Sequence, residues 1–417
     1  MAARGAEGLV LQRHGDRGQA GRYAVVAFGL DDVSFLGSDA GRLALAEVGR
    51  LDLGTTTLVN DIGSVRTRFG DRAAVLVETV QLRRRAAAKF ADASEWLFTD
   101  EALQQATAGP VAAHRARRLA GATVHDATCS IGSELAALRD TASHVVGSDV
   151  DPVRLAMARH NLGSGPGAEV ALCRADALRP VTRDAVVVVD PARRSGARRR
   201  FDPRAYQPPL DELLAVLADR DHVVKCAPGI DFAMMTEMGF DGEIEVTSLA
   251  GGVREACLWS AGLTAAGVRR RATVLDTGEQ LTDTEPDDCG VAPAGRWLVD
   301  PDGAVVRAGL VRHYAARHGL WQIDPDIAYL SGDRLPDGVR GFEVLEQLPY
   351  SERHLRQALS ARAVGAVEIL VRGVDVDPDA LRSRMRLRGD DRASVVITRL
   401  GSGAASRATA FICRPSR

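Results

Sequence analysis

The sequence predicts an α/β protein with a mainly parallel sheet, preceded by a helical domain and followed by a small α+β domain. Three observations lead to this prediction. Residues from about 28 to 120 place apolar side chains at helical spacing, with arginines on the other face. From 121 to 260, short apolar strands such as AVVVVD alternate with helical segments, which is typical of a parallel sheet buried on both faces. Residues 341–417 follow the order strand, helix, strand, helix, strand, strand.

The composition excludes several classes of protein. The chain has 417 residues, enough for about two to four domains, and its net charge of −2 gives no overall basic field for nucleic acid. No apolar run approaches the roughly 18 residues that span a bilayer, and the first residues lack the apolar core of a secretory signal. Six scattered cysteines form no C-x-x-C pair, which favours a reducing cytoplasm. We therefore expect a cytoplasmic protein with no membrane segment and no metal site.

Changes in sequence texture divide the chain into five parts. They are a disordered N-terminus (1–27), a helical domain (28–120), a strand–helix domain (121–265), a linker or mixed α+β region (266–340) and the small α+β domain (341–417). The fourth part contains an acidic stretch rich in proline and glycine, TVLDTGEQLTDTEPDDCGVAPAGRW, which indicates a loop or linker. In the helical domain, Thr99 or Asp100 is expected to cap one helix and Thr107 the next.

The strand–helix domain is expected to end in an antiparallel pair. The stretches GEIEVTSLA and VREACLWSAGL are separated only by Gly251 and Gly252, which leaves no room for a crossover helix. A hairpin should therefore close the sheet.

Each of the first four expected strands ends in an aspartate: Asp126, Asp149, Asp176 and Asp190. The carboxyl ends of parallel strands meet at one edge of a sheet, where ligands bind, so these carboxylates should lie together. Asp149 follows Asp126 by 23 positions, near the spacing of about 20 at which an acid accepts hydrogen bonds from ribose hydroxyls. Asp176 is suited to the exocyclic amine of adenine. A single member of such a set can also be a helix cap, which is the explanation for Asp151.

The first strand leads into a turn, VHDATCSIGSELAAL, that is poor in glycine. Only Gly132 remains where a dinucleotide-binding turn would have three glycines. A pyrophosphate favours the full glycine pattern, whereas the ammonium of an amino-acid tail prefers Asp126 and backbone carbonyls. S-adenosylmethionine therefore fits this edge better than NAD.

At this point the sequence resembles the class I S-adenosylmethionine-dependent methyltransferases, whose sheet is Rossmann-like and parallel with a terminal antiparallel hairpin. VHDATCSIGSELAAL looks like their first motif, VVGSDVDPVRLAMARHNL like the second, CRADAL like the third and VVVVDPARR like the fourth. The resemblance covers about residues 121–262. It implies an enzyme with S-adenosylmethionine as cofactor. Ser130 stands where most members have glycine, which could lower affinity or reshape the turn.

The same resemblance assigns a role to individual residues. For the cofactor it implies, from its methionine part through ribose to adenine, Asp126, Thr128, Cys129, Ser130, Gly132, Asp149, Val150, Asp176 and Ala177, with Asp190 beside them. Asp190, Pro191 and Arg193 would face the acceptor. Methyltransferases that act on amino groups have a Pro-Pro-aromatic turn here, and Ala192–Arg193 replaces it.

The whole chain resembles bacterial methyltransferases with a C-terminal THUMP-like domain. The segments that carry this resemblance are WLFTDEALQQAT, DPARR, VKCAPGID and VEILVRGVDVDPDALRSRMRLRG. THUMP domains are associated with RNA, usually tRNA, so the resemblance implies structured RNA (tRNA or rRNA) as partner. Arginines at 384, 386 and 388 are expected to form a positive patch, or else a solvated helix face. The sequence does not identify any protein partner, so protein partners stay unknown at this point.

Two segments offer candidate catalytic groups. In VVKCAPGID, Cys226 is placed like the cysteine of C5-pyrimidine RNA methyltransferases that attacks the base, with Lys225 able to lower its pKa. The alternative for Cys226 is a small buried residue. Lys225, one of two lysines, has either a role for its ammonium or an ion pair with Asp190 or Asp231. Glu255 is a possible base or a hairpin surface charge.

The second segment is the arginine-rich stretch that follows Asp190. The side chains in DPARRSGARRRF are Arg193, Arg194, Arg198, Arg199 and Arg200, and they form either a phosphate clamp or a solvated loop. We thus expect a methyltransferase that acts on RNA by direct transfer. The alternatives are an RNA-binding module that has lost the cofactor and a methyltransferase for small molecules.

Overall fold

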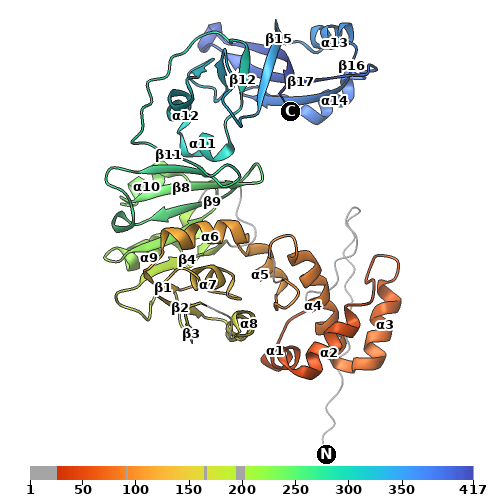
Figure 1. Ribbon diagram of the computed structural model, residues 1–417, viewed down its shortest axis with the longest axis vertical. Helices are drawn as coiled ribbons and strands as arrows, with labels where there is room; N and C mark the ends of the chain where they lie inside the picture. Colours follow the sequence, from red (N-terminus) through yellow and green to blue (C-terminus); the bar gives the residue numbers. More distant parts are fainter. Residues whose placement is uncertain (1–25, 91–92, 164–166, 194–201, 417) are drawn as a thin grey trace, which may run out of the picture. The chain divides into compact units, whose positions relative to one another are not determined.

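The computed structural model describes residues 26–90, 93–163, 167–193 and 202–416 (Figure 1). The chain divides into two compact units, residues 1–106 and 107–417, and each is described by itself. The first unit therefore ends before the boundary expected at residue 120. The finer division of the chain into five parts stays a prediction.

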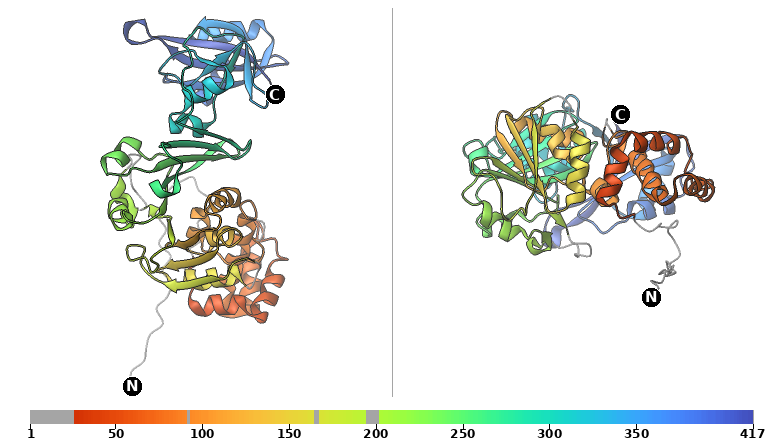
Figure 2. Two further views of the ribbon diagram at one scale, coloured as in Figure 1. Left: turned by 60° about the vertical axis from the view of Figure 1, so that its left-hand side comes forward. Right: turned by 90° about the horizontal axis from the view of Figure 1, so that it is seen from below.

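The first unit is helical, as predicted (Figure 2). Its helices are α1 (Leu30–Gly37), α2 (Asp39–Val48), α3 (Leu58–Phe69), α4 (Ala73–Ala86) and α5 (Asp100–Gln105). Leucines at helical spacing form its core, among them the fully buried Leu36, Leu76 and Leu82. Thr99 caps α5 by accepting from the Ala102 N–H at 3.1 Å, and Lys89 Nζ closes the other end by donating to the Leu103 carbonyl at 2.8 Å.

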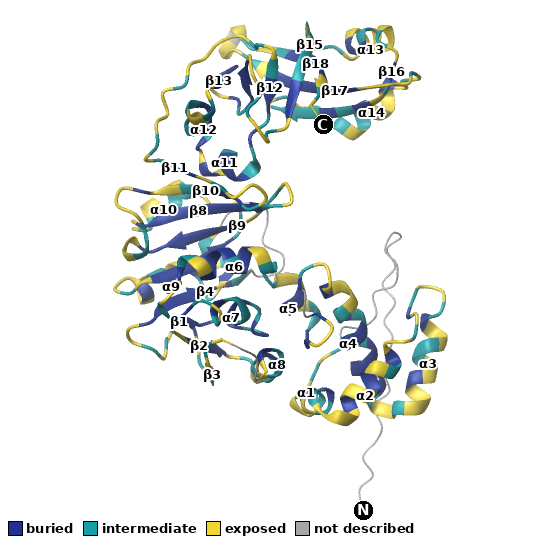
Figure 3. Cartoon of the chain, viewed as in Figure 1, coloured by how far each residue is buried: buried dark blue, intermediate teal, exposed yellow. Residues whose placement is uncertain are grey.

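A nine-stranded sheet forms the centre of the second unit, in the order β11-β10-β8-β9-β7-β4-β1-β2-β3. The strands are β1 (Thr123–Asp126), β2 (His144–Asp149), β3 (Val170–Arg174), β4 (Val186–Val189), β7 (His222–Cys226), β8 (Glu243–Leu249), β9 (Gly252–Trp259), β10 (Arg270–Val274) and β11 (Glu279–Thr282). Strands β3, β2, β1, β4 and β7 are parallel, and β9 is antiparallel to both β7 and β8. Most residues of these central strands are buried (Figure 3).

The β8–β9 hairpin confirms the predicted antiparallel pair, but the expectation that it closes the sheet was wrong. Strand β10 pairs in parallel with β8, and β11 follows antiparallel to β10. Part of the acidic stretch expected to be a loop therefore extends the sheet. The segment RRATVLDTGEQLT is rich in polar and turn residues, so its sequence does not predict these two short strands. They are stabilised by pairing with their neighbours rather than by an apolar pattern of their own.

Helices cover this sheet or connect its strands. They are α6 (Gly109–Arg118), α7 (Ser133–Leu138), α8 (Pro152–Leu162), α9 (Leu210–Leu217), α10 (Phe232–Glu237), α11 (Gly303–Ala308) and α12 (Val311–His318). Thr107 was expected to cap α6, but Ala108 occupies the N-cap position without a side-chain bond. Val305 of α11 and Leu310 lie in the same apolar core as Val187 and Val224 of the central strands. Residues 266–340 are therefore largely part of the packed unit.

A seven-stranded sheet follows, in the order β13-β14-β12-β15-β18-β17-β16. Its elements are β12 (Trp297–Val299), β13 (Trp321–Gln322), β14 (Leu330–Gly332), β15 (Gly341–Pro349), α13 (Glu352–Ala361), β16 (Val364–Arg372), α14 (Pro378–Met385), β17 (Asp391–Leu400) and β18 (Arg407–Pro415). The predicted order β-α-β-α-β-β over 341–417 is confirmed. Leu355 of α13 and Leu381 of α14 share one core with Val395 and Ile412 of this sheet.

Candidate functional site

The residues predicted for the site gather at one edge of the nine-stranded sheet. Asp126 and Asp149 end β1 and β2, Asp190 directly follows β4, and Lys225 lies at the end of β7. These strands are parallel, so their carboxyl ends point the same way and bring the four side chains to one edge. Asp176 lies just beyond the neighbouring strand β3. The edge predicted from the aspartate pattern is thus present.

The glycine-poor turn after β1 keeps its shape although serine occupies position 130. Ser130 has a φ of +48° and Gly132 a φ of +86°, so both adopt the left-handed conformation that glycine favours. For serine this conformation costs on the order of 1–2 kcal/mol. At Gly132 a side chain would also come within 3.3 Å of the Ala158 Cβ atom on α8. The turn therefore forms with a serine at position 130. Position 132, where a side chain would also be crowded, has a glycine.

Asp149 is held rigidly against this turn. Its Oδ2 accepts from the Ser130 N–H at 3.0 Å and its Oδ1 accepts from the Asp151 N–H at 2.9 Å. Each carboxylate oxygen has a further lone pair, so the fixed group can still accept bonds from vicinal hydroxyls. Asp151 caps α8 as predicted, with Oδ1 accepting from the Val153 N–H at 2.8 Å. The adjacent Val150 is 58% exposed, an apolar surface at this edge suited to contact a planar base.

Asp126 is buried and carries an unusual proton affinity. Burial, followed by the nearby Glu134 carboxylate, raises the pKa of Asp126 to about 8. Its Oδ1 accepts from the Thr128 N–H at 3.1 Å. Burial also opposes ionisation of Glu134, but the ion pair with Arg115 outweighs it and lowers the pKa of Glu134. A cation that reached Asp126 would therefore lie near the ionised Glu134, which is paired with Arg115. It would also favour ionisation of Asp126 itself.

The adenine end of the predicted site is more open. Asp176 is exposed, and its Oδ1 accepts from the Leu178 N–H at 2.9 Å, which fixes the carboxylate in a local turn. Ala177 between them is buried. Cys129 of the first turn is buried as well, and burial raises the pKa of its thiol, so the group is an apolar part of the turn at neutral pH.

Asp190, which was predicted to face the acceptor, is joined to both the first turn and β7. Its N–H donates to Thr128 Oγ1 at 2.7 Å, and its Oδ2 forms an ion pair with Lys225 Nζ. The same ammonium donates to Thr107 Oγ1. Burial lowers the pKa of Lys225, but the Asp190 carboxylate outweighs it, so the pKa lies above its usual value. Of the two partners considered for Lys225, Asp190 is the one in contact, while Asp231 caps α10 by accepting from the Ala233 N–H at 3.0 Å.

Cys226 occupies a different environment from the one a nucleophile needs. It is 5% exposed and belongs to the apolar core with Val224, Ile230 and Met235. The neighbouring Lys225 ammonium is bound to Asp190 rather than available to a thiolate. These contacts favour the alternative of a small buried residue.

The segment that follows Asp190 is anchored at its base. Pro191 is buried, and β5 (Ala192–Arg193) pairs antiparallel with β6 (Tyr206–Gln207). Tyr206 Oη accepts from the Ala227 N–H at 3.2 Å, which ties this ribbon to the turn after β7. The arginines predicted as a phosphate clamp at 194 and 198–200 lie outside the described residues.

A buried ionic network joins α6 to the sheet, and sequence reasoning missed it. Arg115, 1% exposed, donates to both oxygens of Glu134 at 2.7 and 3.1 Å and to Glu255. Further ion pairs are Arg118–Glu243, Arg118–Glu245 and Arg271–Glu243, at 2.7 to 2.8 Å, and His114 is hydrogen-bonded to Glu245 at 2.7 Å. Glu255, considered as a base, is therefore a buried partner of Arg115. Two acids at alternate positions of one strand, 243 and 245, were the available signal for a polar sheet face.

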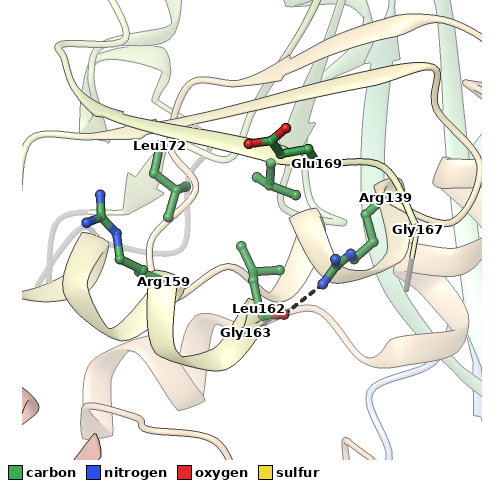
Figure 4. A pocket seen from close by; sticks show the side chains of 8 residues that line it. Arg139, Arg159, Leu162, Gly163, Gly167, Glu169 and Leu172 are labelled. Atoms are coloured by element: carbon green, nitrogen blue, oxygen red, sulfur yellow. Dashed lines mark hydrogen bonds between the residues drawn. The ribbon is translucent and has the colours of Figure 1, made fainter. Parts of the chain in front are cut away.

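Two cavities lie away from this edge. One of about 500 Å³ lies between α8 and the start of β3 and is lined by Arg139, Arg159 and Glu169 (Figure 4). The second, of about 710 Å³, lies around His222 at the start of β7. Both are lined by residues at the amino ends of parallel strands, β3 and β7, whereas the aspartates lie at the carboxyl ends. Among the described residues, no group of three or more His, Cys, Asp or Glu side chains could hold a metal ion.

None of the described helices is both long and apolar enough to span a bilayer.

Known proteins resemble this chain along most of its length. Two proteins from strains CDC 1551 / Oshkosh and ATCC 25618 / H37Rv of Mycobacterium tuberculosis are each 69% identical over 359 residues, which is 85% of this chain and all of the relative. Both are named uncharacterised S-adenosylmethionine-dependent methyltransferases. The crystal structure of a protein from Porphyromonas gingivalis W83, described as a methyltransferase, has a TM-score of 0.71 and 20% identity over 93% of this chain and 98% of its own.

Two segments also match protein families. Residues 339–415 match the family described as THUMP domain-like, and residues 29–86 match a domain of unknown function, DUF8688. The first match coincides with the β-α-β-α-β-β unit, and the second covers α1 to α4. The sheet, the relatives and this carboxyl-terminal match agree with one another. The chain belongs to the S-adenosylmethionine-dependent methyltransferases as a class I enzyme with a THUMP-like carboxyl-terminal domain, and S-adenosylmethionine is its cofactor.

Proposed function

We propose that this enzyme methylates structured RNA, either tRNA or rRNA, in the cytoplasm by direct transfer. The observation that carries the chemical part is the Asp190–Lys225 ion pair beside the turn that holds Asp126 and Asp149. The RNA part is supported by the THUMP-like match, because domains of that kind are generally RNA-binding. The scattered cysteines support the cytoplasm.

The cofactor fits the residues at the edge of the sheet. We assign the methionine end to Asp126 and the turn 128–132, the ribose to Asp149, and the adenine to the surface between Val150 and Asp176–Ala177. The fixed carboxylate of Asp149 and the exposed apolar Val150 suit a ribose and a planar base. S-adenosylmethionine supplies a methyl group already activated on a sulfonium, so the protein needs mainly to position the acceptor.

Asp190 is the group best placed to orient an acceptor. Its side chain is 42% exposed, and Lys225 holds one of its oxygens, which fixes the direction of the carboxylate. The remaining oxygen can accept a hydrogen bond from an N–H or O–H of the acceptor and can take up its proton. Pro191 would frame the same position, and Arg193 stays a sequence-based candidate beside it. Cys226 is 5% exposed and is not included as a nucleophile.

The THUMP-like domain supplies a surface for an RNA backbone. Arg353 and Arg356 lie exposed on α13, and Arg386 and Arg388 lie exposed after α14. Helices α13 and α14 lie side by side, joined by the two-pronged ion pair of Arg384 with Glu352 at 2.7 and 3.1 Å. Basic side chains from both helices therefore lie on adjoining elements, an arrangement suited to phosphate contacts.

Tritium transfer from methyl-labelled S-adenosylmethionine tests this proposal. Purified enzyme is incubated with tRNA, rRNA and a small-molecule extract, each from a strain that lacks the enzyme, and nucleosides are then identified by mass spectrometry. We expect label in tRNA or rRNA and none with Asp190→Ala, whereas Asp219→Ala, a change at an exposed position after α9, serves as the control. Label only in small molecules would replace RNA with another acceptor. Binding of RNA without transfer, together with no binding of S-adenosylmethionine, would favour a binding module instead.

A further inference from the structure

The turn between β7 and α10, residues 227–231, lies at the acceptor side of the site. It directly follows Lys225 and Cys226, and β7 is the neighbour of β4, which ends at Asp190. The Ala227 N–H is bound to Tyr206 Oη, and the Ile230 N–H donates to the Ala227 carbonyl at 3.1 Å. Gly229 at the tip of the turn is exposed. The position of this tip therefore helps to define where an acceptor can lie.

Arg307 of α11 holds the far side of this turn. Its Nε donates to the Pro228 carbonyl at 2.5 Å, and its Nη2 donates to the Ile230 carbonyl. The guanidinium also lies over the ring of Phe232, 5.3 Å from its centroid. One side chain thus binds two carbonyls that flank Gly229 and contacts the first residue of α10.

These contacts require a guanidinium. Its donors lie in a planar fork that can bind two diverging carbonyls at once, whereas a lysine ammonium is a single point on a flexible stem. Two carbonyls on either side of one residue also fix the direction of the peptide between them. Arg307 therefore restrains the backbone of the turn rather than merely adding a surface charge.

Arg307 lies on helix α11, which is connected to both sheets of the second unit. Helix α11 packs on β8, β9 and β10, and its residues Ala304 and Val305 are fully buried in the core of the sheet. The strand before it, β12, belongs to the seven-stranded sheet that the THUMP-like strands complete. The segment that carries Arg307 is thus continuous with both sheets of this unit.

We propose that Arg307 is a positioning residue for methyl transfer: it fixes the β7–α10 turn on the acceptor side and links that turn to the segment leading into the THUMP-like sheet. This inference rests on the proposed function in one respect, namely that the turn faces the acceptor. The hold of Arg307 on the turn itself does not depend on which acceptor is used.

Hydrogen exchange and methyl transfer together test this inference. Arg307→Lys and Arg307→Gln are compared with Arg312→Lys, a change on the neighbouring helix α12, where Arg312 contacts Asp287 at 3.5 Å. We expect the Ile230 amide to exchange at least about tenfold faster in both Arg307 variants and at the wild-type rate in Arg312→Lys, tenfold corresponding to about 1.4 kcal/mol. The Kd of S-adenosylhomocysteine should stay within about twofold in all variants, because the turn 128–132 is untouched.

Methyl transfer to tRNA and rRNA from the strain that lacks the enzyme then tests the RNA substrate and the positioning role of Arg307 separately. We expect kcat/KM for RNA to fall about tenfold or more in Arg307→Lys while cofactor binding is kept. Unchanged exchange at Ile230, or unchanged transfer despite faster exchange, would overturn the positioning role. If wild-type enzyme transfers no methyl group to either RNA, the proposed substrate fails, and the exchange result still decides whether Arg307 holds the turn.

Discussion

Lys225 and Asp190 form an ion pair across the neighbouring strands β7 and β4, and the same ammonium binds the hydroxyl of Thr107. Thr107 is the first residue of the second compact unit. The chain has two lysines, and the other, Lys89, donates to the carbonyls of Leu103 and Gln104 at 2.8 and 3.3 Å. Both lysines therefore act as compact ammonium groups that bind several oxygens, a role for which a planar guanidinium is less suited.

Because there are two lysines, their titration can be followed individually. The measurement uses protein labelled with ¹³C at lysine Cε. We expect Lys225 to keep its proton to higher pH than Lys89, because Asp190 raises the pKa of Lys225 whereas burial lowers the pKa of Lys89. Asp190→Asn should lower the pKa of Lys225, because burial then acts without the opposing carboxylate. Asp231→Asn is the control and should leave the Lys225 signal unchanged. A Lys225 signal that ignores Asp190→Asn would contradict the ion pair.

The raised pKa of Asp126 predicts how stability depends on pH. The folded protein keeps Asp126 protonated up to about pH 8, while the unfolded chain ionises it near its ordinary value of 3.8. Between these values the folded state binds more protons, so this residue makes the free energy of unfolding fall as pH rises, by up to about 1.4 kcal/mol per pH unit. Urea unfolding at pH 5, 6.5 and 8 should show a smaller fall in Asp126→Asn than in wild type. Parallel curves would disprove the shift.

Cofactor binding should depend on pH in the opposite direction. If the ammonium of the methionine end lies at Asp126, binding requires the carboxylate, which becomes more available as pH approaches 8. We expect the affinity for S-adenosylhomocysteine to rise by up to about fiftyfold between pH 6 and 8 in wild type, as the ionised fraction of Asp126 rises. In Asp126→Asn the affinity should be lower and nearly independent of pH. Calorimetry at both pH values measures this difference.

Asp149→Asn should weaken cofactor binding although it keeps the shape of the side chain. Both oxygens of Asp149 accept from backbone N–H groups, so an amide must turn its own donor toward one of them. We expect the Kd of S-adenosylhomocysteine to rise by about tenfold or more. Asp151→Asn is the matched control, because asparagine caps a helix about as well as aspartate. Equal affinity of the two variants would remove Asp149 from the site.

Cys226→Ala should keep methyl transfer. The thiol is buried among apolar residues, so its loss should reduce stability by about 1 kcal/mol and leave transfer to RNA within about threefold of wild type. Loss of transfer with intact cofactor binding, or a covalent RNA adduct that needs Cys226, would restore it as a nucleophile.

Arg115→Met should destabilise the second unit strongly. The change leaves Glu134 and Glu255 buried without their shared cation, a loss on the order of 3–5 kcal/mol in the free energy of unfolding. Arg117→Met on the same helix serves as a control. Denaturant unfolding at pH 7 measures the difference, and similar midpoints for the two variants would contradict the network.

Much of the fold followed from patterns within short segments. The strands β1, β2, β3, β4 and β7, the β8–β9 hairpin and the order of elements after residue 341 were predicted because each has its own apolar period and its own turn residues. The aspartate edge followed as well, since parallel topology alone brings the carboxyl ends of strands together. Strands β10 and β11 were missed because pairing with β8, rather than their own composition, makes them strands.

The sequence by itself determined the class of the enzyme, the aspartates at one edge of its sheet and its THUMP-like domain. Only the structure showed that Ser130 leaves the first turn intact, because its backbone adopts the left-handed conformation with a φ of +48°. Only the tertiary structure joined Thr107 and Asp190 to Lys225, and Arg307 to the turn at Pro228. The reason is physical: a residue pattern specifies a local conformation, whereas contacts between residues that are 35 to 118 positions apart depend on how whole elements pack.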